Sequence, residues 1–508
     1  MDRPFLFYIA VLSVFIVGDV PVLAAPIDIG TRRELFADRY IVAALTGDIE
    51  LRLHHPVPRE IVFEHDASWE GSASGYHSVF HDGEKYRLYY KSMQVDFVDD
   101  AMAPNGNRYL CYAESEDAIH WTRPSLGLFE HDGSKDNNIV VAEGGDWGGL
   151  RPDGAHASVF LDENPSCPPE RRFKMLVSSF KPKGLLVFYS EDGIHWTPLV
   201  DRPVMTEGAF DSQNLAFWDP VGKVYRAYWR IFSNNRRAIR TATSTDLIKW
   251  EPFRNVSYTG GAPAEHLYTN QIKPYYRAPH LLLGFPARYT ERDVVAPSFE
   301  SLPEPRHRKL RMAATERLGT GLTDTLLLCG RDGEVFERWP EAFLKPGPER
   351  PGQWKYGDNY MAWHIVETPS HLPGAPPELS FFASEGYWTG KSNQLRRYTL
   401  RLDGFVSASA KLSGGSVLTK PLKFAGDRLF VNFATSAGGD LRVGIEYADG
   451  VPVEGFGIDD CPSVFGDSVD RSVEWTGDAD LSSLKGKAVR LRFALRDADL
   501  FSFQFRDE

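Results

Sequence analysis

The stretch Ser-Thr-Asp-Leu-Ile-Lys-Trp at residues 244–250 decides the fold, because near copies of it recur along the chain. Residues 115–121 and 190–196 repeat its Ser-x-Asp-x-x-x-Trp pattern, and weaker copies occupy 330–336 and 401–405. Successive aspartates of the five copies are 54 to 86 residues apart: Asp117, Asp192, Asp246, Asp332 and Asp403. That spacing is the size of one four-stranded propeller blade with its loops.

The repeated motif has a physical reason that needs no catalysis. Each strong copy follows a short apolar run, as a turn at the end of a strand would. An Asp or Ser side chain accepts hydrogen bonds from backbone N–H groups in such a turn, and a Trp four residues later covers apolar surface between sheets. We therefore interpret the five aspartates as turn residues with a structural role.

Short runs of Val, Ile, Tyr, Phe and Trp broken by turn residues fill the chain between the motifs. A hairpin around Asp82-Gly83 is followed by four more, which pair 157–161 with 173–178, 215–219 with 224–229, 271–276 with 281–285, and 361–367 with 378–383. No stretch shows sustained helical periodicity. The sequence predicts an all-β fold, a five-bladed β-propeller over residues 60–407 followed by a C-terminal β-sandwich over 408–508.

The N-terminal segment divides into two parts. Residues 1–25 combine a short charged start, an apolar run of 13 residues and small residues near Ala24, which is typical of a secretory signal peptide. We therefore expect a secreted or periplasmic protein with no membrane span after signal cleavage. Residues 26–59 alternate in polarity and are expected to be N-terminal edge strands packing on the propeller.

Composition excludes some partners. The 508 residues carry a formal charge of -12, whereas nucleic acids and anionic membranes attract basic surfaces. A carbohydrate substrate is the natural expectation, and no motif indicates a cofactor or a metal site. The four cysteines, Cys111, Cys167, Cys329 and Cys461, allow two disulfides in any of three connectivities or remain as buried thiols. The oligomeric state is open.

Candidate catalytic residues follow from propeller geometry, because the first residues of the inner strands meet at one mouth of the central channel. An acidic residue precedes each expected inner strand: Glu70, Asp153, Asp211, Glu265 and Asp358. We expect catalysis from Asp211, Glu265, Asp153 and Glu70. We expect substrate contacts from Asp358, His156, His266, Asn214 and Trp69.

Carboxylates gathered in an aromatic pocket fit glycosidic chemistry. One carboxylic acid protonates the leaving oxygen, and a second carboxylate attacks the sugar or activates water. Repulsion between neighbouring carboxylates and partial burial would raise the pKa of one of them and keep it protonated. The distance between the two carboxyl groups distinguishes retaining from inverting enzymes, and the sequence does not give that distance.

The motif at 244–250, with its copies at 115 and 190, resembles the repeated Ser-x-Asp-Leu-x-x-Trp of the five-bladed propeller glycosidases of glycoside hydrolase families 32, 43 and 68. A propeller followed by a β-sandwich is also the layout of family 32. The whole chain resembles little-characterised exported bacterial proteins of planctomycete type that are described as family 32-like. The family 32 nucleophile motif Asn-Asp-Pro-Asn-Gly is absent, so the resemblance implies the fold but assigns neither the reaction nor a catalytic residue.

Three functions follow as hypotheses. The first is an exported glycoside hydrolase that cleaves a poly- or oligosaccharide, with Asp211 and one of Glu265, Asp153 or Glu70 as the working pair. The second is a non-catalytic carbohydrate-binding propeller at the cell surface. The third is a glycoside phosphorylase or transglycosylase on the same scaffold, for which Arg236, Arg237 and Arg288 are the candidate phosphate ligands.

Overall fold

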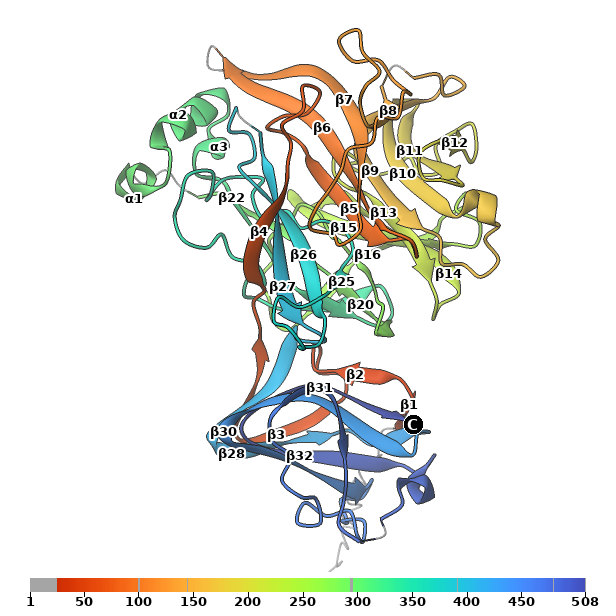
Figure 1. Cartoon of the computed structure of the whole chain (residues 1–508), viewed down its shortest axis with the longest axis vertical. Helices are drawn as coiled ribbons and strands as arrows, with labels where there is room; N and C mark the ends of the chain where they lie inside the picture. Colours follow the sequence, from red (N-terminus) through yellow and green to blue (C-terminus); the bar gives the residue numbers. More distant parts are fainter. Residues whose placement is uncertain are drawn as a thin grey trace, which may run out of the picture.

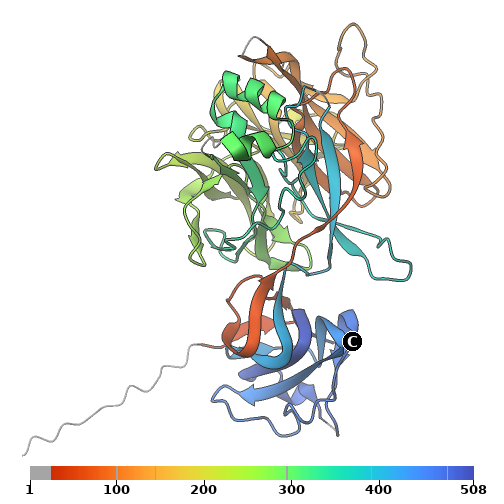
Figure 2. The same ribbon diagram turned by 90° about the vertical axis from the view of Figure 1, so that its left-hand side faces the viewer.

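The computed structural model describes residues 25–98, 101–143, 145–292, 296–390, 392–477 and 479–507. The expected signal peptide therefore lies outside the described residues, apart from its last position. The chain is built mostly of strands, as an all-β fold requires. Figure 1 shows a large body, which holds residues 57–401, above a small body, and Figure 2 shows the narrow waist between them.

The first three strand groups of the large body are four-stranded antiparallel sheets in chain order. The first consists of β5 (Gly75–His81), β6 (Tyr86–Val98), β7 (Ala101–Ser115) and β8 (Ile139–Ala142). The second consists of β9 (Arg151–Leu161), β10 (Phe173–Lys181), β11 (Lys183–Ser190) and β12 (Thr197–Pro198). The third consists of β13 (Leu215–Asp219), β14 (Val224–Ser233), β15 (Arg236–Ser244) and β16 (Glu251–Asn255).

The fourth strand group is split into two sheets. One contains β17 (Ser257–Thr259), β19 (Lys273–Tyr275), β20 (Ala278–Gly284), β23 (Leu328–Gly330) and β24 (Val335–Arg338). The other contains β18 (His266–Leu267), β21 (Ala287–Thr290) and β22 (Leu322–Thr325). The five hairpins predicted from the sequence are all present, because turn residues and alternating apolar residues specify register locally.

The fifth strand group closes the large body with a strand from the other end of the chain. It consists of β25 (Val366–Thr368), β26 (Glu378–Glu385), β27 (Gln394–Arg401) and β4 (Val57–Glu64). β4 pairs antiparallel with β27, and a parallel bridge between Ser78 and Trp363 joins the first group to the fifth. The strand groups therefore follow one another around a closed circuit.

The repeated motif forms the turns that the sequence predicts. Asp117 Oδ1 accepts hydrogen bonds from the backbone N–H groups of Ile119 and His120, at 2.9 and 2.8 Å. Asp192 and Asp246 repeat this arrangement, and Asp332 keeps it without the Trp. The structural role of these four aspartates is confirmed by their hydrogen bonds.

The fifth copy was wrongly grouped with the other four. Asp403 is fully buried where the two bodies meet, and its carboxylate accepts hydrogen bonds from Tyr275, Arg277 and Ser502 at 2.7 to 2.8 Å. Arg33 donates a further bond at 3.3 Å. Asp403 therefore links four distant segments and does not hold its own turn.

The small body combines both ends of the described chain. Its strands are β1 (Ile27–Gly30), β2 (Arg33–Leu35), β3 (Val42–Leu53), β28 (Val406–Thr419), β29 (Leu422–Phe424), β30 (Arg428–Tyr447), β31 (Asp467–Val473) and β32 (Val489–Arg506). β1 pairs with β29, β2 with β32 and β3 with β28. The expectation that residues 26–59 pack on the propeller is therefore corrected for β1 to β3, and only β4 joins the large body.

An insertion between β21 and β22 contains three short helices, which the search for helical periodicity missed. They are α1 (Ala296–Ser301), α2 (Pro305–Ala314) and α3 (Arg317–Thr320), at the upper left of Figure 1. Two further 3-10 turns are η1 (Pro169–Arg171) and η2 (Leu481–Leu484). The face of α2 that packs inward carries Arg308 and Arg311 instead of apolar residues. The sequence therefore lacks the apolar stripe that usually predicts a helix.

All four cysteines are free thiols, which decides against the two disulfides allowed by the sequence. Cys111, Cys329 and Cys461 are buried, and Cys167 is partly buried. Among the described residues, no helix combines the length and the apolar character that a membrane span requires.

Candidate active site

Side chains from all five strand groups meet where the inner strands begin. We call this place the upper mouth and define it by Tyr76, His156, Asp211, Tyr268 and Tyr360. The ring centroids of Tyr76 and His156 are 5.5 Å apart, those of Tyr76 and Tyr360 are 6.4 Å apart, and those of Tyr268 and Tyr360 are 5.5 Å apart. Residues nearly three hundred positions apart are thereby brought into one aromatic cluster.

Three more aromatic residues extend one wall of the upper mouth. The ring of Tyr356 is 5.8 Å from that of Tyr268, and Tyr387 stacks at 6.3 Å on Tyr360 and at 5.1 Å on Trp388. Gly357 is required for this packing, because a Cβ there would lie 1.9 Å from Cδ1 of Tyr387. We call Tyr356, Tyr387 and Trp388 the aromatic wall.

Asp153 is the buried acidic residue at the start of β9. Its carboxylate accepts hydrogen bonds from the backbone N–H groups of Ala155 and His156 at 3.0 Å, and one from the hydroxyl of Ser178. Its Oδ2 is 2.5 Å from Nδ1 of His156. Burial alone would raise the pKa of Asp153, but His156 and Ser178 hold it below its usual value. The pair therefore orients the imidazole ring, with Nδ1 toward Asp153.

Asp211 is the exposed acidic residue of the upper mouth. Its side chain is 64 % exposed, and it forms an ion pair with the buried guanidinium group of Arg230 on β14. Desolvation opposes ionisation, but Arg230 and then His156 hold the pKa of Asp211 below its usual value. Asn214 keeps the preceding turn in place by donating to the carbonyl oxygens of Phe210 and Ser212 at 3.0 and 2.7 Å.

Asp358 lies fully buried beside the aromatic wall. It accepts hydrogen bonds from the backbone N–H groups of Lys355 and Tyr387 at 3.0 and 3.1 Å. Burial raises the pKa of Asp358 to about 7, although both backbone bonds, Lys355 and Arg311 act in the opposite direction. This carboxyl therefore holds Tyr387 in position through its backbone N–H, and the expected substrate contact of Asp358 stays a prediction.

Glu70 and Glu265 are held in ion pairs that occupy both oxygens of each carboxylate. Glu70 is buried and is held by Arg123 at 2.9 Å and by Tyr90. Glu265 pairs with Arg288 at 3.1 Å and Arg338 at 2.9 Å. These contacts hold both carboxylates in place through arginine partners, and the expected catalytic roles of Glu70 and Glu265 stay predictions.

The remaining expected contact residues lie at the rim or away from the upper mouth. Nδ1 of His266 accepts a bond from the backbone N–H of Arg237 at 3.3 Å, and its ring packs edge-on against Tyr289. Trp69 donates from Nε1 to Oδ1 of Asn138 at 2.8 Å and lies against His131. Within the described residues, no group of three or more His, Cys, Asp or Glu side chains is arranged to hold a metal ion.

Sequence reasoning missed Lys91 and Arg230, two basic residues of the upper mouth, and it named the third, Arg237, only as a candidate phosphate ligand. Nζ of Lys91 on β6 donates to the hydroxyl of Tyr387 at 3.0 Å and lies 4.8 Å from the ring centroid of Tyr76. The guanidinium groups of Arg230 and Arg237 lie 4.7 and 5.0 Å from the ring centroid of Tyr268. These residues lie on second and third strands, away from the inner-strand starts, so chain position does not indicate that Lys91 and Arg230 reach the upper mouth.

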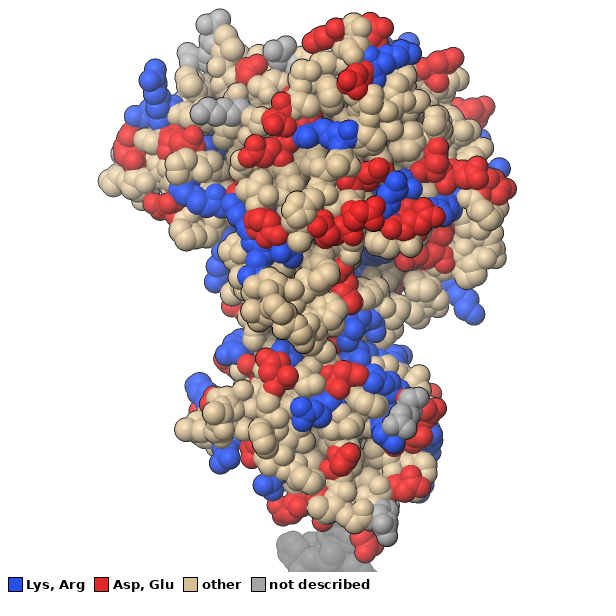
Figure 3. All heavy atoms as spheres, viewed as in Figure 1, with Lys and Arg blue, Asp and Glu red and all other residues tan. Residues whose placement is uncertain are grey.

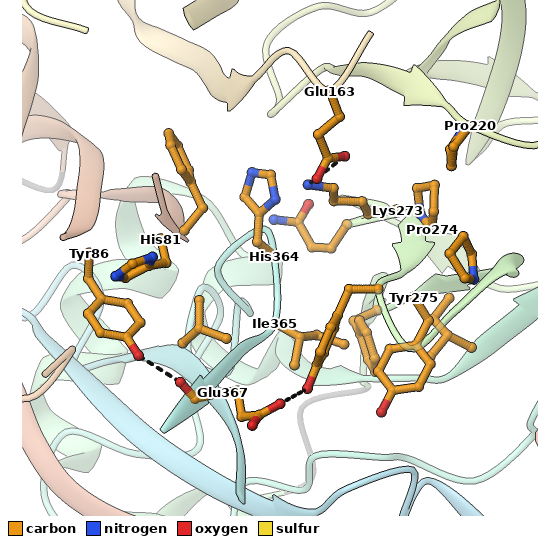
Figure 4. Close-up of a pocket in the computed structure, with 17 residues that line it drawn as sticks. His81, Tyr86, Glu163, Pro220, Lys273, Pro274, Tyr275, His364, Ile365 and Glu367 are labelled. Carbon is orange, nitrogen blue, oxygen red and sulfur yellow. Dashed lines mark hydrogen bonds and ion pairs between the residues drawn. The ribbon is translucent and has the colours of Figure 1, made fainter. Parts of the chain in front are cut away.

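A separate cavity of about 630 Å³ opens at the other end of the inner strands, and Figure 4 shows its lining. Phe80, Tyr275 and Pro274 supply apolar surface, while Glu163 and Lys273 face each other with Oε2 and Nζ 3.7 Å apart. None of the five acidic residues predicted from the sequence lines this cavity. It is therefore distinct from the upper mouth.

No family model matches the chain. No curated protein matches it either. Among solved structures, it is similar to a glycoside hydrolase at 13 % identity, with a TM-score of 0.41 and coverage of 68 % of this chain and 92 % of that one. An N-acetylgalactosamine deacetylase from F. plautii, solved with blood group B trisaccharide, is similar at 11 % identity, with a TM-score of 0.41 and coverage of 69 % and 94 %. A fructofuranosidase from Schwanniomyces occidentalis is similar at 12 % identity, with a TM-score of 0.37 and coverage of 91 % and 100 %.

Proposed function

We propose that the protein is an exported glycoside hydrolase that cleaves a poly- or oligosaccharide in the upper mouth. In this proposal the five strand groups are the five blades of a propeller, and the small body is a β-sandwich that supports it. One observation carries the proposal. Asp211 lies near the hydrogen-bonded pair of Asp153 and His156, which comes from another strand group, and tyrosine rings pack beside them.

The groups of the upper mouth divide the chemistry between them. Asp211 is ionised and open to solvent, so it serves as the nucleophile or as the base that activates water. His156 is oriented by Asp153 through Nδ1, which leaves Nε2 to exchange a proton with the leaving oxygen. The developing positive charge on the sugar ring is stabilised by the nearby carboxylates, and the tyrosine faces supply the large apolar contact area that sugar rings need.

Substitution of Asp211 tests this proposal. Wild-type protein and Asp211→Asn, His156→Gln and Asp201→Asn variants would be screened for release of reducing ends from a polysaccharide panel. We expect the first two variants to lose at least about 100-fold in kcat/KM, the usual scale for a positioned acid or base. Asp201 is the matched control, because its side chain is 91 % exposed and, among the described residues, pairs only with Arg202 at 3.9 Å.

Two outcomes would contradict the proposal. Equal turnover by wild type and Asp211→Asn would remove Asp211 from the mechanism. Saturable glycan binding by the wild type without any turnover on the panel would favour a carbohydrate-binding protein instead.

A further inference from the structure

The charge of the upper mouth is opposite to that of the protein as a whole. The chain carries a formal charge of -12, and the face shown in Figure 3 mixes acidic and basic residues over both bodies. The upper mouth nevertheless gathers Lys91, Arg230 and Arg237, and Arg317 lies 5.7 Å from the ring of Tyr356 at its edge. Two exposed carboxylates lie near these cations: Asp211 pairs with Arg230, and Glu291 lies near His266 and Tyr289.

Arg230 is incompletely satisfied within the described protein. Its side chain is 3 % exposed, and Nη2 pairs with Asp211, but Nε and Nη1 are buried without a hydrogen-bond partner. Buried guanidinium groups normally use their donors, because desolvated N–H groups without acceptors cost about 1 to 3 kcal/mol or more. An acceptor supplied from outside the chain would relieve this cost.

Arg237 brings a second guanidinium group to the same ring. Nε of Arg237 also lacks a hydrogen-bond partner, while Nη1 lies 3.2 Å from Nδ1 of His266. Both guanidinium groups are within 5.0 Å of the centroid of Tyr268. Two like charges facing one ring repel each other, so an anion beside Tyr268 would be attracted by both.

Lys91 adds a third basic group to the upper mouth. Within the described residues it has no ion-pair partner, and its hydrogen bond goes to the neutral hydroxyl of Tyr387. Burial, and to a lesser extent Arg108 on β7, lower the pKa of Lys91 to about 7 against the opposing effect of Asp153 on β9. The rings of Tyr76 and Tyr387 cover the ammonium group on two sides.

We propose that the upper mouth binds an anionic saccharide, whose acidic group is held by Arg230, Arg237 and Lys91 against the ring of Tyr268. Planar, forked guanidinium groups suit a carboxylate or a sulfate ester, and the aromatic wall suits the sugar ring that carries it. Naming this saccharide as the substrate rests on the proposed function, but binding of the anion can be measured whether or not the protein cleaves it.

Calorimetric titration of the full chain tests the inference. The probes would be an oligogalacturonate, the same oligosaccharide as its neutral methyl ester, and a sulfated galactan oligosaccharide of equal length. We expect the charged probes to bind at least 10-fold more tightly than the ester and to weaken as salt is added. The relative affinities for the sulfated and the carboxylated probe show which acidic group the site prefers.

Matched variants locate the binding site. Arg237→Gln should weaken binding of the charged probe about 10-fold or more, whereas Arg240→Gln on the same strand β15 should not, because Arg240 bonds to Asn255 and Glu207. Titration in two buffers of different ionisation enthalpy should show proton uptake near pH 7 for the wild type and a smaller uptake for Lys91→Met. Thermal melting checks that each variant is folded.

The outcomes separate the two proposals. Equal affinity for acid and ester, or equal effects of Arg237→Gln and Arg240→Gln, would overturn the anionic substrate class while leaving hydrolysis of neutral glycans in place. Tight binding of the acidic probe with no cleavage of any glycan would support the substrate class and reject the hydrolase.

Discussion

Asp403 illustrates how one carboxylate stabilises the junction between the two bodies. It is fully buried, contacts Arg33 and Arg277, and accepts a bond from Tyr275 of the large body and from Ser502 of the small body. Burial opposes its ionisation, but Arg33 and Arg277 hold the pKa of Asp403 below its usual value. The ion pairs therefore favour the folded state wherever the carboxylate is ionised.

Asp403→Asn should lower the free energy of unfolding by about 3 to 5 kcal/mol, because it leaves Arg277 without its counter-charge and Arg33 with only the more distant Asp470 at 3.6 Å. The contribution of Asp403 should be fully present above the unfolded-state pKa of about 3.9 and should be lost as pH falls through the lower folded-state pKa. Urea unfolding at several pH values measures this. Asp467→Asn is the control, since Asp467 is 66 % exposed in its ion pair with Arg401 and such surface pairs contribute about 0 to 1 kcal/mol. Equal destabilisation by the two substitutions would contradict the assigned role.

Sequence reasoning found some residues of the upper mouth and not others for a clear reason. Asp153, Asp211 and His156 lie next to inner-strand starts, where chain position alone implies convergence. Lys91, Arg230 and Arg237 reach the same place from second and third strands, where direction depends on twist and packing between sheets, so only Arg237 was named, and as a phosphate ligand. Glu70 and Glu265 satisfied the positional rule, but their arginine partners lie 23 to 73 residues away and could not be paired from the sequence.

At the scale of elements, helix α2 braces the aromatic wall from behind. Arg311 is fully buried and donates from Nη1 to the carbonyl oxygen of Tyr387 and from Nη2 to that of Tyr356, both at 3.2 Å. Arg308 donates to the carbonyl oxygens of Gln353 and Trp354, in the loop just before Tyr356. The helix therefore fixes the loops that carry two tyrosines of the site.

Arg311→Leu should loosen the aromatic wall without touching the reacting groups. Loss of two charge-assisted hydrogen bonds, each contributing about 1.5 to 3 kcal/mol, should raise KM for the cleaved glycan more than it lowers kcat. Steady-state kinetics and a thermal melt on the same preparation measure this. Arg306→Leu, on the exposed face of the same helix, is the matched control. A lowered kcat with unchanged KM would argue against a positioning role for Arg311.

Elements differed in how far the sequence specified them. Hairpins were predictable because turn residues and two-residue alternation act over a few positions. Helix α2 was not, because its buried side chains are arginines whose partners are backbone carbonyls 45 to 76 residues away. β1 to β3 were read as strands correctly, but alternation carries no information about which sheet a strand joins.

At the scale of the whole molecule, the chain leaves the small body after β3, circles the large body and returns at β28. Figure 1 shows both passages in the waist, with β3 and β28 in the same sheet below it. Phe285, Phe343 and Phe381 of the large body pack around Phe405 at the junction, with centroid distances of 6.2 to 6.4 Å. The two bodies therefore share one apolar core through the waist.

This topology predicts that residues 406–507 do not fold without the N-terminal strands. Leu35, Phe36 and Ile41 are each at most 1 % exposed within the small body, and burial of each contributes about 1.5 to 3 kcal/mol. Their loss would remove much of the 5 to 15 kcal/mol that stabilises a typical domain, and deletion of β3 would also open the edge of β28 to other chains. A chain that begins at residue 54 should therefore aggregate or lose its C-terminal part to limited proteolysis, whereas a chain that begins at residue 25 should resist it. Intact protection of residues 406–507 in the shorter chain, read by mass spectrometry of the fragments, would show that the small body folds from its C-terminal strands alone.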